Sequence, residues 1–312
     1  MELVDAHQVR DRTPWPGLID AIADELRSQR AVAPPRHVHR FGLPDGTDGS
    51  FLLMPSWDDG ELVVVKAVTY MGSNAARGRP TVNAGLLAFD GADGRLVAAI
   101  DGDELTARRT AAVSALATRH LARSDAARLV VVGTGVLAPN VARAHSAVRP
   151  IGSIEIWGRR AVRSEAVAAQ LRDEGYPAVA VDDLSTAVAR ADVVSCVTGS
   201  TEPLVRGVWL GAGTHVDLVG SFAPGMRESD DEVVRRGDVF VDTRAGALLA
   251  GDLSQPIDAG VLGVDDVCAD LAELVRGEHP GRTEHRAITV VKSAGSAAAD
   301  LAATRLVLGG AR

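Results

Sequence analysis

A glycine-rich turn near the middle of this 312-residue sequence has the residue order that binds phosphate groups. The apolar run Leu129–Val132 leads into Gly133-Thr134-Gly135-Val136-Leu137-Ala138, which reads as a strand, a GxGxxA turn and the start of a helix. The first glycine permits the tight turn, the second lets a pyrophosphate approach the backbone, and Ala138 lets the helix pack on the strand. The helix start offers N–H groups to the phosphates. We therefore predict a dinucleotide site that includes Gly133, Thr134, Gly135, Val136 and Leu137.

The tip of the next predicted strand, Ser153–Trp157, indicates which dinucleotide is bound. An enzyme specific for NAD usually places Asp or Glu at this tip, where the carboxylate binds the ribose 2′-OH. Here the tip reads Gly158-Arg159-Arg160, and guanidinium groups pair with a 2′-phosphate. The competing carboxylate, Glu155, lies inside the strand. We predict a cofactor site at the tip with NADP(H) preferred and NAD(H) possible; the alternative is that both arginines form a solvated turn.

The predicted elements change character at about Arg128. From there short apolar strands alternate with helices of ten or so residues, which is typical of a parallel sheet covered on both faces. Six strands are predicted, as in the doubly wound dinucleotide fold: 128–133, 153–157, 178–181, 192–198, 214–219 and 238–241. The preceding part is mixed, with helices at 16–30 and 103–123 and strands at 51–55, 61–69, 82–89 and 95–100. Helices are predicted again at 265–276 and 293–308.

The composition excludes several classes of function. The chain is 46% hydrophobic and 24% charged with a net charge of −8, and no basic run suggests a nucleic-acid surface. No uncharged apolar run approaches the ~18 residues of a membrane span. The N-terminal segment lacks the apolar core of a signal peptide, so we expect a cytoplasmic protein.

Some histidines and aspartates are expected to have no role in chemistry. His37, His39 and His145 belong to no compact His/Cys/Asp constellation, so we expect surface or loop histidines and no metal site. Asp217, Asp230 and Asp231 are expected to cap or start a helix. Cationic residues upstream are more promising. Lys66 ends an apolar run as a solvated terminus or a poised cation, and of Arg108 and Arg109 only one is expected to point inward.

Five segments, in this order, resemble the ornithine cyclodeaminase/mu-crystallin family over nearly the whole chain. They are Val65-Lys66-Ala67, Arg79-Pro80-Thr81, Leu105-Thr106-Ala107-Arg108-Arg109-Thr110-Ala111-Ala112, Gly133-Thr134-Gly135 and Lys292-Ser293-Ala294-Gly295. The Thr-x-x-Arg-Thr helix is specific to this family. The resemblance implies an α/β fold with two domains and a homodimer. Residues 1–122, completed by a C-terminal helix at 290–312, would bind substrate and dimerise, and residues 123–289 would form a six-stranded parallel Rossmann domain.

One position separates the branches of the family. Its cyclodeaminases carry a GGDCPGKTE-like segment whose aspartate activates water and handles protons. The matching segment here runs from Gly220 to Glu228 and has Phe222 in the aspartate's place, and phenylalanine is neither an acid nor a base. The segment is instead similar to the GSF(T)P-x-MRE stretch of bacterial Δ1-pyrroline-2-carboxylate reductases. Those enzymes also carry a Leu-Met-Pro-x-Trp segment, here Leu53–Trp57.

This resemblance implies NADPH-dependent reduction of a cyclic imino acid, Δ1-pyrroline-2-carboxylate or Δ1-piperideine-2-carboxylate, to L-proline or L-pipecolate. Lys66 and Arg109 would be catalytic, with Lys66 protonating the imine and Arg109 holding the carboxylate. Arg36 would assist Arg109, although Arg40 is placed to do the same. Met54 and Thr81 would complete the substrate site, and further cofactor contacts would come from Thr110, Thr198, Gly220 and Ser293.

Two alternatives remain open. One is another amino-acid enzyme on the same fold, such as a cyclodeaminase or an alanine-type or opine dehydrogenase. The other is a non-catalytic NADP-dependent binding protein, as the crystallin member of the family suggests. The ring size of the imino acid is left open.

Overall fold

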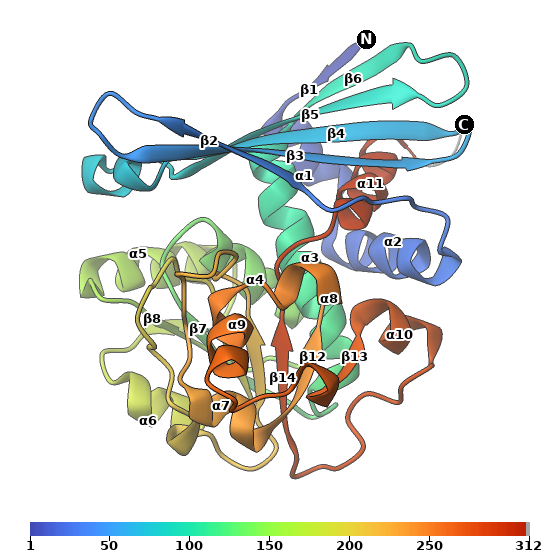
Figure 1. Cartoon of the computed structure of the whole chain (residues 1–312). Helices are drawn as coiled ribbons and strands as arrows, with labels where there is room; N and C mark the ends of the chain where they lie inside the picture. Colours follow the sequence, from blue (N-terminus) through green and yellow to red (C-terminus); the bar gives the residue numbers. More distant parts are fainter. Residues whose placement is uncertain (310–312) are drawn as a thin grey trace. The chain divides into compact units, whose positions relative to one another are not determined.

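The structure, a computed structural model, describes residues 1–309 and divides the chain into two units, each built on its own sheet (Figure 1). One unit comprises residues 1–109 and the segment that begins at Ser296, and the other comprises residues 110–295. The first division lies inside helix α3 (Gly102–Leu121) and the second follows residue 295. The domain boundaries expected from the sequence were 122/123 and 289/290. Because the observed division falls at 109/110, the C-terminal half of α3 belongs to the larger unit.

The smaller unit contains a six-stranded sheet in the order β1-β6-β5-β4-β3-β2. Strand β1 pairs parallel to β6, and every other pair is antiparallel. All four strands predicted in this region are present, whereas β1 and the wholly exposed β2 were missed. The bounds are β1 Glu2–Val4, β2 His37–Gly42, β3 Asp48–Asp58, β4 Leu62–Tyr70, β5 Val82–Asp90 and β6 Leu96–Asp101.

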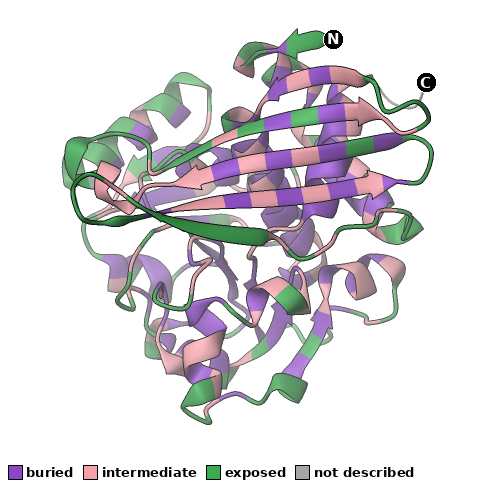
Figure 2. Ribbon diagram, turned by 45° about the horizontal axis from the view of Figure 1, so that its top comes forward, coloured by how far each residue is buried: buried purple, intermediate pink, exposed green. Residues whose placement is uncertain are grey.

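The two faces of this sheet differ in burial. Along β4, Leu62, Val64, Lys66 and Val68 are buried, while the residues between them are exposed or half-buried, because successive side chains of a strand point to opposite faces. Figure 2 shows the same alternation on neighbouring strands. Helix α11 packs with α2 and against β3 and β4. The helices of this unit are α1 (Ala6–Arg12), α2 (Trp15–Ser28), the 3₁₀ segment η1 (Gly72–Arg77) and α11 (Ala297–Val307).

Helix α3 buries two adjacent arginines, although only one was expected to point inward. The Arg108 guanidinium lies 4.1 Å from the Trp15 ring centre, and its Nε–H donates to the Thr13 hydroxyl at 2.7 Å. The Arg109 Nε–H donates to Asp300 of α11 at 2.7 Å. The expectation of a single inward arginine is therefore wrong, because neighbouring positions on a helix differ by about 100° and meet different partners.

The larger unit contains an eight-stranded sheet in the order β13-β12-β14-β11-β10-β7-β8-β9, and all of its pairs are parallel. The six predicted strands are present, so the Rossmann architecture is confirmed, but the count of six is wrong. The strands are β7 Arg128–Val132, β8 Ser153–Trp157, β9 Ala178–Ala180, β10 Val193–Cys196, β11 His215–Leu218, β12 Gly237–Val241, β13 Val267–Asp270 and β14 Ile288–Lys292.

The two additional strands have clear physical origins. Strand β13 occupies the first half of the predicted helix 265–276, and the helix begins only at Leu271, where Asp270 caps it by accepting from the Glu273 N–H. Strand β14 is a wholly buried run between β11 and β12. The helices of this unit are α4 Leu137–Ser146, α5 Ala161–Asp173, α6 Leu184–Ala189, α7 Asp231–Arg236, α8 Arg244–Ala247, α9 Gly251–Asp258 and α10 Leu271–Arg276, with 3₁₀ segments η2 Gly207–Trp209 and η3 Val264–Asp266.

The direction in which successive strands are added to the sheet reverses at β7. From β7 the chain continues outward through β8 and β9, and it then crosses to β10 on the other side of β7. The carboxyl ends of β7 and β10 therefore flank the point where the strand order reverses, which is where such sheets bind ligands. None of the helices formed by residues 1–309 is both long and apolar enough to span a membrane.

Candidate active site

The glycine-rich turn lies at the carboxyl end of β7 and has the geometry of a phosphate cradle. Gly133 has φ of 136°, and a Cβ there would lie 2.9 Å from the Val197 carbonyl oxygen, so only glycine fits. Gly135 is exposed, and a Cβ there would meet nothing within 4 Å. No side chain caps the start of α4 at Val136, which leaves the first N–H groups for an anion. These residues fit the pyrophosphate of a dinucleotide.

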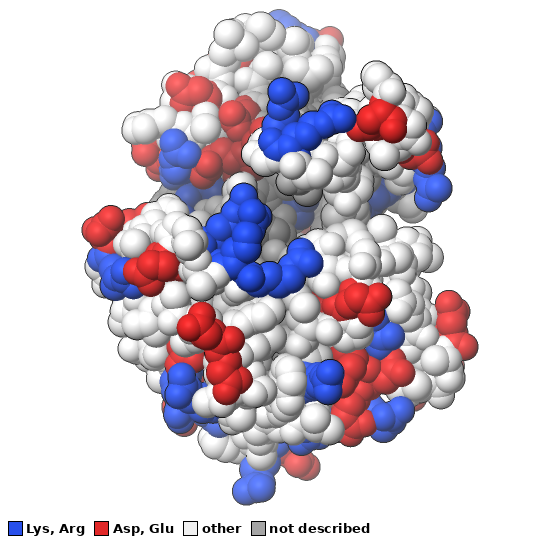
Figure 3. All heavy atoms as spheres, turned by 90° about the vertical axis from the view of Figure 1, so that its left-hand side faces the viewer, with Lys and Arg blue, Asp and Glu red and all other residues white. Residues whose placement is uncertain are grey.

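The tip of β8 presents arginines and no carboxylate. Glu155 is buried inside the strand, where it accepts from Arg190 through Nε (3.1 Å) and Nη2 (3.0 Å), so it is already paired. Gly158 packs closely, since a Cβ there would lie 2.6 Å from the Thr134 side chain. Arg159 and Arg160 are exposed beyond it. Figure 3 shows basic side chains gathered on the side of the molecule where α5 lies in Figure 1.

Three more predicted cofactor residues follow adjacent strands. Thr198 comes after β10, Gly220 after β11 and Ser293 after β14, so all three lie at the carboxyl edge of the sheet. A Cβ on Gly220 would collide with the backbone of Thr198. The Ser293 hydroxyl is buried and has no hydrogen-bond partner within residues 1–309. One further predicted cofactor residue, Thr110, lies on α3, where the larger unit begins.

A buried group of charged side chains forms in the smaller unit around Lys66 of β4. The Lys66 Nζ lies 2.9 and 2.8 Å from the two carboxylate oxygens of Asp300, and Arg109 donates to the first of them. Lys66 and Asp300 are 0% exposed and Arg109 is 5% exposed. One carboxylate therefore bridges two cations, which leaves the group with net positive charge and suited to an anionic ligand.

The pKa of Lys66 is lowered from 10.5 to about 7, mainly because the ammonium loses its hydration on burial and next because of the Arg109 charge. Asp300 opposes both effects, while Arg36 adds a smaller lowering. Lys66 can therefore exchange a proton near neutral pH. Arg36 is near enough for its charge to affect Lys66, and Arg40 lies on the exposed strand β2.

The other two predicted substrate residues have different surroundings. Met54 of β3 is the direct cross-strand neighbour of Lys66 and is buried on the same face. Thr81 lies just before β5, and its carbonyl oxygen accepts from the Met71 N–H at 2.8 Å. Within the described residues, no hydrogen bond connects Thr81 to the Lys66 group. The structure thus brings together Lys66, Arg109 and Met54 and leaves Thr81 outside that group.

Asp300 is the residue that the sequence reasoning missed. It lies 234 positions from Lys66 and 191 from Arg109, so no local motif contains all three. The available signal was its neighbourhood, because one aspartate within Ala297-Ala298-Ala299-Asp300-Leu301-Ala302-Ala303 would be buried with the alanines. A buried carboxylate requires a cation, and Lys66 and Arg109 were the available candidates.

A buried serine, histidine and aspartate also meet in the larger unit. His145 and Asp217 are 0% exposed, so the expectations of a surface histidine and of a helix cap at Asp217 are wrong. Asp217 accepts from the hydroxyls of Ser114 and of Ser195 (2.7 Å), while His145 Nε2 lies 3.2 Å from the Ser114 hydroxyl. The Ser114 proton is directed to the aspartate rather than to histidine, so the set lacks the arrangement of a serine nucleophile.

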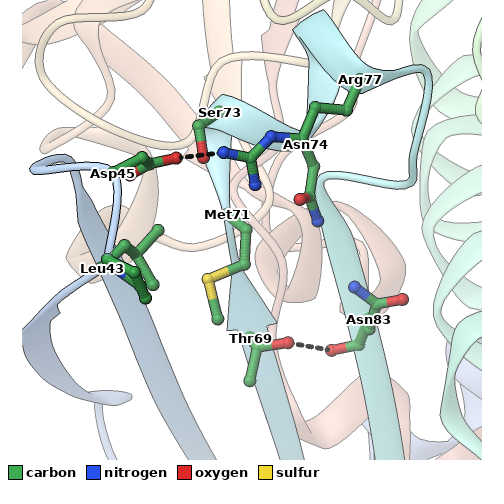
Figure 4. A pocket seen from close by; sticks show the side chains of 9 residues that line it. Leu43, Asp45, Thr69, Met71, Ser73, Asn74, Arg77 and Asn83 are labelled. Carbon is green, nitrogen blue, oxygen red and sulfur yellow. Dashed lines mark hydrogen bonds and ion pairs between the residues drawn. The ribbon is translucent and has the colours of Figure 1, made fainter.

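A cavity of about 400 Å³ in the smaller unit is lined by Thr69, Met71, Asn83 and the Asp45–Arg77 ion pair (2.8 Å), among others (Figure 4). Thr69 and Lys66 are three positions apart on β4 and therefore point to opposite faces of the sheet. The cavity is separate from the Lys66 group. Within residues 1–309, no cluster of three or more His, Cys, Asp or Glu is placed to hold a metal ion.

Comparison with known proteins identifies the family of this chain. Residues 2–312 match the ornithine cyclodeaminase/mu-crystallin family. The chain belongs to this family. A Δ1-pyrroline-2-carboxylate reductase of Paracoccus denitrificans is 39% identical over 263 residues, which cover 84% of this chain and 82% of that protein. The resemblance inferred from the sequence is thus confirmed.

Solved structures of the family superpose over nearly the whole chain. The Δ1-pyrroline-2-carboxylate reductase of Thermococcus litoralis, in complex with NADH and L-proline, is 30% identical with a TM-score of 0.93, covering 98% of this chain and 96% of that one. An archaeal alanine dehydrogenase dimer with bound NAD is 27% identical with a TM-score of 0.90, covering 98% and 94%. Both support a fold of two α/β domains, one of them Rossmann-like.

Proposed function

We propose that this family member reduces a cyclic imino acid, Δ1-pyrroline-2-carboxylate or Δ1-piperideine-2-carboxylate, to L-proline or L-pipecolate with NADPH. The observation that carries the proposal is the Lys66–Asp300–Arg109 group. It combines a proton donor whose pKa is near neutral with a guanidinium for a carboxylate, which are the two groups that a 2-imino acid requires. The P. denitrificans and T. litoralis reductases support the same substrate class.

The substrate carboxylate is held by arginine. Asp300 engages the Nε–H of Arg109, and the Nη groups of that guanidinium provide the paired donors that a carboxylate accepts. Arg36 supplies a second positive charge. Met54, beside Lys66 in the sheet, offers an apolar surface to the ring methylenes.

Lys66 supplies the proton. Transfer from its ammonium to the imine nitrogen makes the adjacent carbon far more electrophilic, and the neutral amine that results remains hydrogen-bonded to Asp300. When bound, reduced nicotinamide supplies the hydride that this carbon accepts, so one proton and one hydride convert C=N to CH–NH. Phe222 has no proton to exchange, which disfavours a cyclodeaminase.

The preference for NADPH is proposed from the tip of β8. Glu155 is committed to Arg190, so no carboxylate at this tip competes for the ribose. Arg159 and Arg160 are exposed where a 2′-phosphate would lie. NADH remains a weaker substrate in this proposal, since the glycine-rich turn binds the pyrophosphate that both dinucleotides share.

The test is an assay with a panel of substrates, in which the oxidation of NADPH or NADH is measured as a loss of nicotinamide absorbance. The two cyclic imines, pyruvate with ammonia, and ornithine with NAD⁺ or NADP⁺ are each offered to the purified chain. We expect NADPH to be oxidised fastest with a cyclic imine at mildly acid to neutral pH. Absence of turnover with both imines at every pH from 5 to 8 would refute the proposal, and release of ammonia from ornithine would favour a cyclodeaminase.

We also propose that the chain forms a homodimer through the open face of its six-stranded sheet. This face has a hollow of about 730 Å³ with an apolar lining that includes Leu53, Val65, Ala67 and Leu87. Exposed apolar patches of this kind mark protein interfaces, and a twofold axis lets one patch cover its copy. Light scattering should give a dimer mass, and Leu87→Asp should give a monomer. Val162→Asp, on the exposed surface of α5, is the control that should stay dimeric.

A further inference from the structure

The carboxylate of Glu228 is fully buried at the carboxyl edge of the eight-stranded sheet, where it joins two loops. Its Oε1 accepts from the N–H (2.6 Å) and the hydroxyl (2.9 Å) of Thr198, in the loop after β10. Its Oε2 accepts from the N–H groups of Gly220 (2.7 Å) and Ser221 (3.3 Å), in the loop after β11. Each oxygen therefore holds a different loop.

A second set of contacts holds Glu228 itself. Asp252, in the first turn of α9, accepts from the backbone N–H groups of Glu228 (2.8 Å) and Ser229 (3.1 Å). The Lys292 Nζ lies 3.4 Å from Asp252 and donates to the Leu218 carbonyl oxygen at 2.9 Å. Burial and the charge of Asp252 raise the pKa of Glu228, and Lys292 opposes this shift. These contacts fix the backbone of Glu228, and the hydrogen bonds from Thr198, like the charge of Lys292, favour its ionised carboxylate against the effect of burial.

The loop after β10 lies against the glycine-rich turn, and the loop after β11 lies against the loop after β10. A Cβ on Gly133 would lie 2.9 Å from the Val197 carbonyl oxygen, and Val197 immediately precedes Thr198. Gly220 approaches the Thr198 backbone so closely that no side chain would fit there. A displacement of either loop would therefore change the shape of the turn that faces the pyrophosphate.

We propose that Glu228 is a positioning residue for the nicotinamide dinucleotide, whose carboxylate holds the loops after β10 and β11 against the Gly133 turn. The inference rests on the dinucleotide dependence in the proposed function. It assigns Glu228 no contact with substrate or with the reacting atoms. Cofactor affinity, rather than the rate of the chemical step, is the quantity that depends on Glu228.

The deciding variant is Glu228→Gln, which keeps the shape and removes one acceptor. In either orientation the amide turns an NH₂ group toward two donors, either those of Thr198 or those of Gly220 and Ser221. One loop then loses its anchor. We expect the Kd for NADPH to rise roughly tenfold, as lost hydrogen bonds to a charged group predict. The KM for NADPH should rise with it, while kcat at saturating NADPH changes less than about twofold.

Asp192 provides a matched control at the opposite, amino edge of the same sheet. It is also buried, and one oxygen accepts from the N–H groups of Ala127 and Arg128, each at 2.9 Å. Its other oxygen accepts from Arg123 at 2.7 Å. Asp192→Asn therefore weakens a comparable anchor far from the glycine-rich turn. It should lower the melting temperature without changing the Kd for NADPH.

The measurement is direct titration of NADPH by fluorescence in the absence of any imine, with melting temperatures for each variant. Wild-type affinity in Glu228→Gln, or equal losses of affinity in Glu228→Gln and Asp192→Asn, would overturn the proposal. If Glu228→Gln does not fold, Asp252→Asn carries the same test, with a smaller loss of affinity expected and unchanged affinity overturning the proposal. A wild-type chain that binds NADPH but reduces no imine would contradict the proposed function alone.

Discussion

The glycine-rich edge of the larger unit and the Lys66 group of the smaller unit use different chemical groups. The edge uses backbone N–H groups and glycines, and its central motif occupies six consecutive residues, 133–138. The Lys66 group uses buried charged side chains from β4, α3 and α11, separated by 191 and 234 positions. The first region depends on glycines such as Gly133 and Gly220, where a Cβ would collide with the backbone, whereas in the buried ion group each single change leaves a charge without its partner.

The largest effect expected from this comparison is that of Lys66→Met. If Lys66 donates the proton, kcat/KM for the cyclic imine should fall by about 10²–10⁴-fold. The Kd for NADPH, which depends on the other unit, should stay within about twofold of wild type. Steady-state kinetics and cofactor titration check both parts. Equal losses in both quantities would mean that the two regions are not separable.

The pH dependence follows from the same lysine. Only the ammonium form donates a proton, and the pKa of Lys66 is about 7, so the active form is complete below that pH and is lost above it. We expect kcat/KM to fall tenfold per unit above pH 7, to about one hundredth at pH 9. In Asp300→Asn the decline should begin at lower pH, because the charge that raises the pKa is gone. If the pH profile of Asp300→Asn equals that of the wild type, the decline of kcat/KM above pH 7 does not arise from Lys66.

Stability distinguishes the regions in a second way. Asp300→Asn leaves Lys66 and Arg109 buried without a counter-charge, and breaking such a pair costs about 3 kcal/mol of the free energy of unfolding. Arg159→Ala, at the exposed tip of β8, should change this free energy by less than about 0.5 kcal/mol. Urea unfolding of the two variants beside wild type gives both numbers. A similar small loss in each would remove the contrast between the regions.

Arg159→Ala has its own, smaller effect on cofactor choice. Loss of one guanidinium from a 2′-phosphate should raise the KM for NADPH roughly tenfold and leave the KM for NADH unchanged. Arg163→Ala is the comparison variant. Arg163 lies four residues further along, in α5, and is also exposed, so its loss should change the KM for NADPH less. Kinetics with both cofactors checks the prediction. Unchanged discrimination in Arg159→Ala would assign NADPH preference, if present, to other residues.

The extent to which each region could be predicted reflects the same contrast. The Gly133 turn, its flanking strand and its helix were recognisable because all of their determinants are local. Strand β14 was missed although its β-branched sequence, Ile288-Thr289-Val290-Val291, is typical of a strand; only its place between β11 and β12 depends on sheet topology. In the smaller unit, Lys66 and Arg109 were recognised through the family resemblance, but Asp300 was not, because its burial depends on packing between α11 and the sheet.

His145 and Asp217 show the limit of reasoning from polarity. Both are polar residues whose local sequence is compatible with exposure, yet they are fully buried with Ser114 and Ser195. Hydrogen bonds with the two serines offset part of the cost of burying them, while His145 Nδ1 and Asp217 Oδ1 have no hydrogen-bond partner within residues 1–309. These contacts join four separate segments, so no pattern within one segment of this chain reveals them.

The place of α11 has a consequence for the order of synthesis. Asp300 follows Lys66 by 234 residues, and the entire parallel-sheet unit lies between them. At roughly 5–20 residues per second, on the order of 10–50 seconds pass on the ribosome between the appearance of the lysine and that of its carboxylate. During that interval the nascent six-stranded sheet has no counter-ion for Lys66 and no α11 to cover β3 and β4.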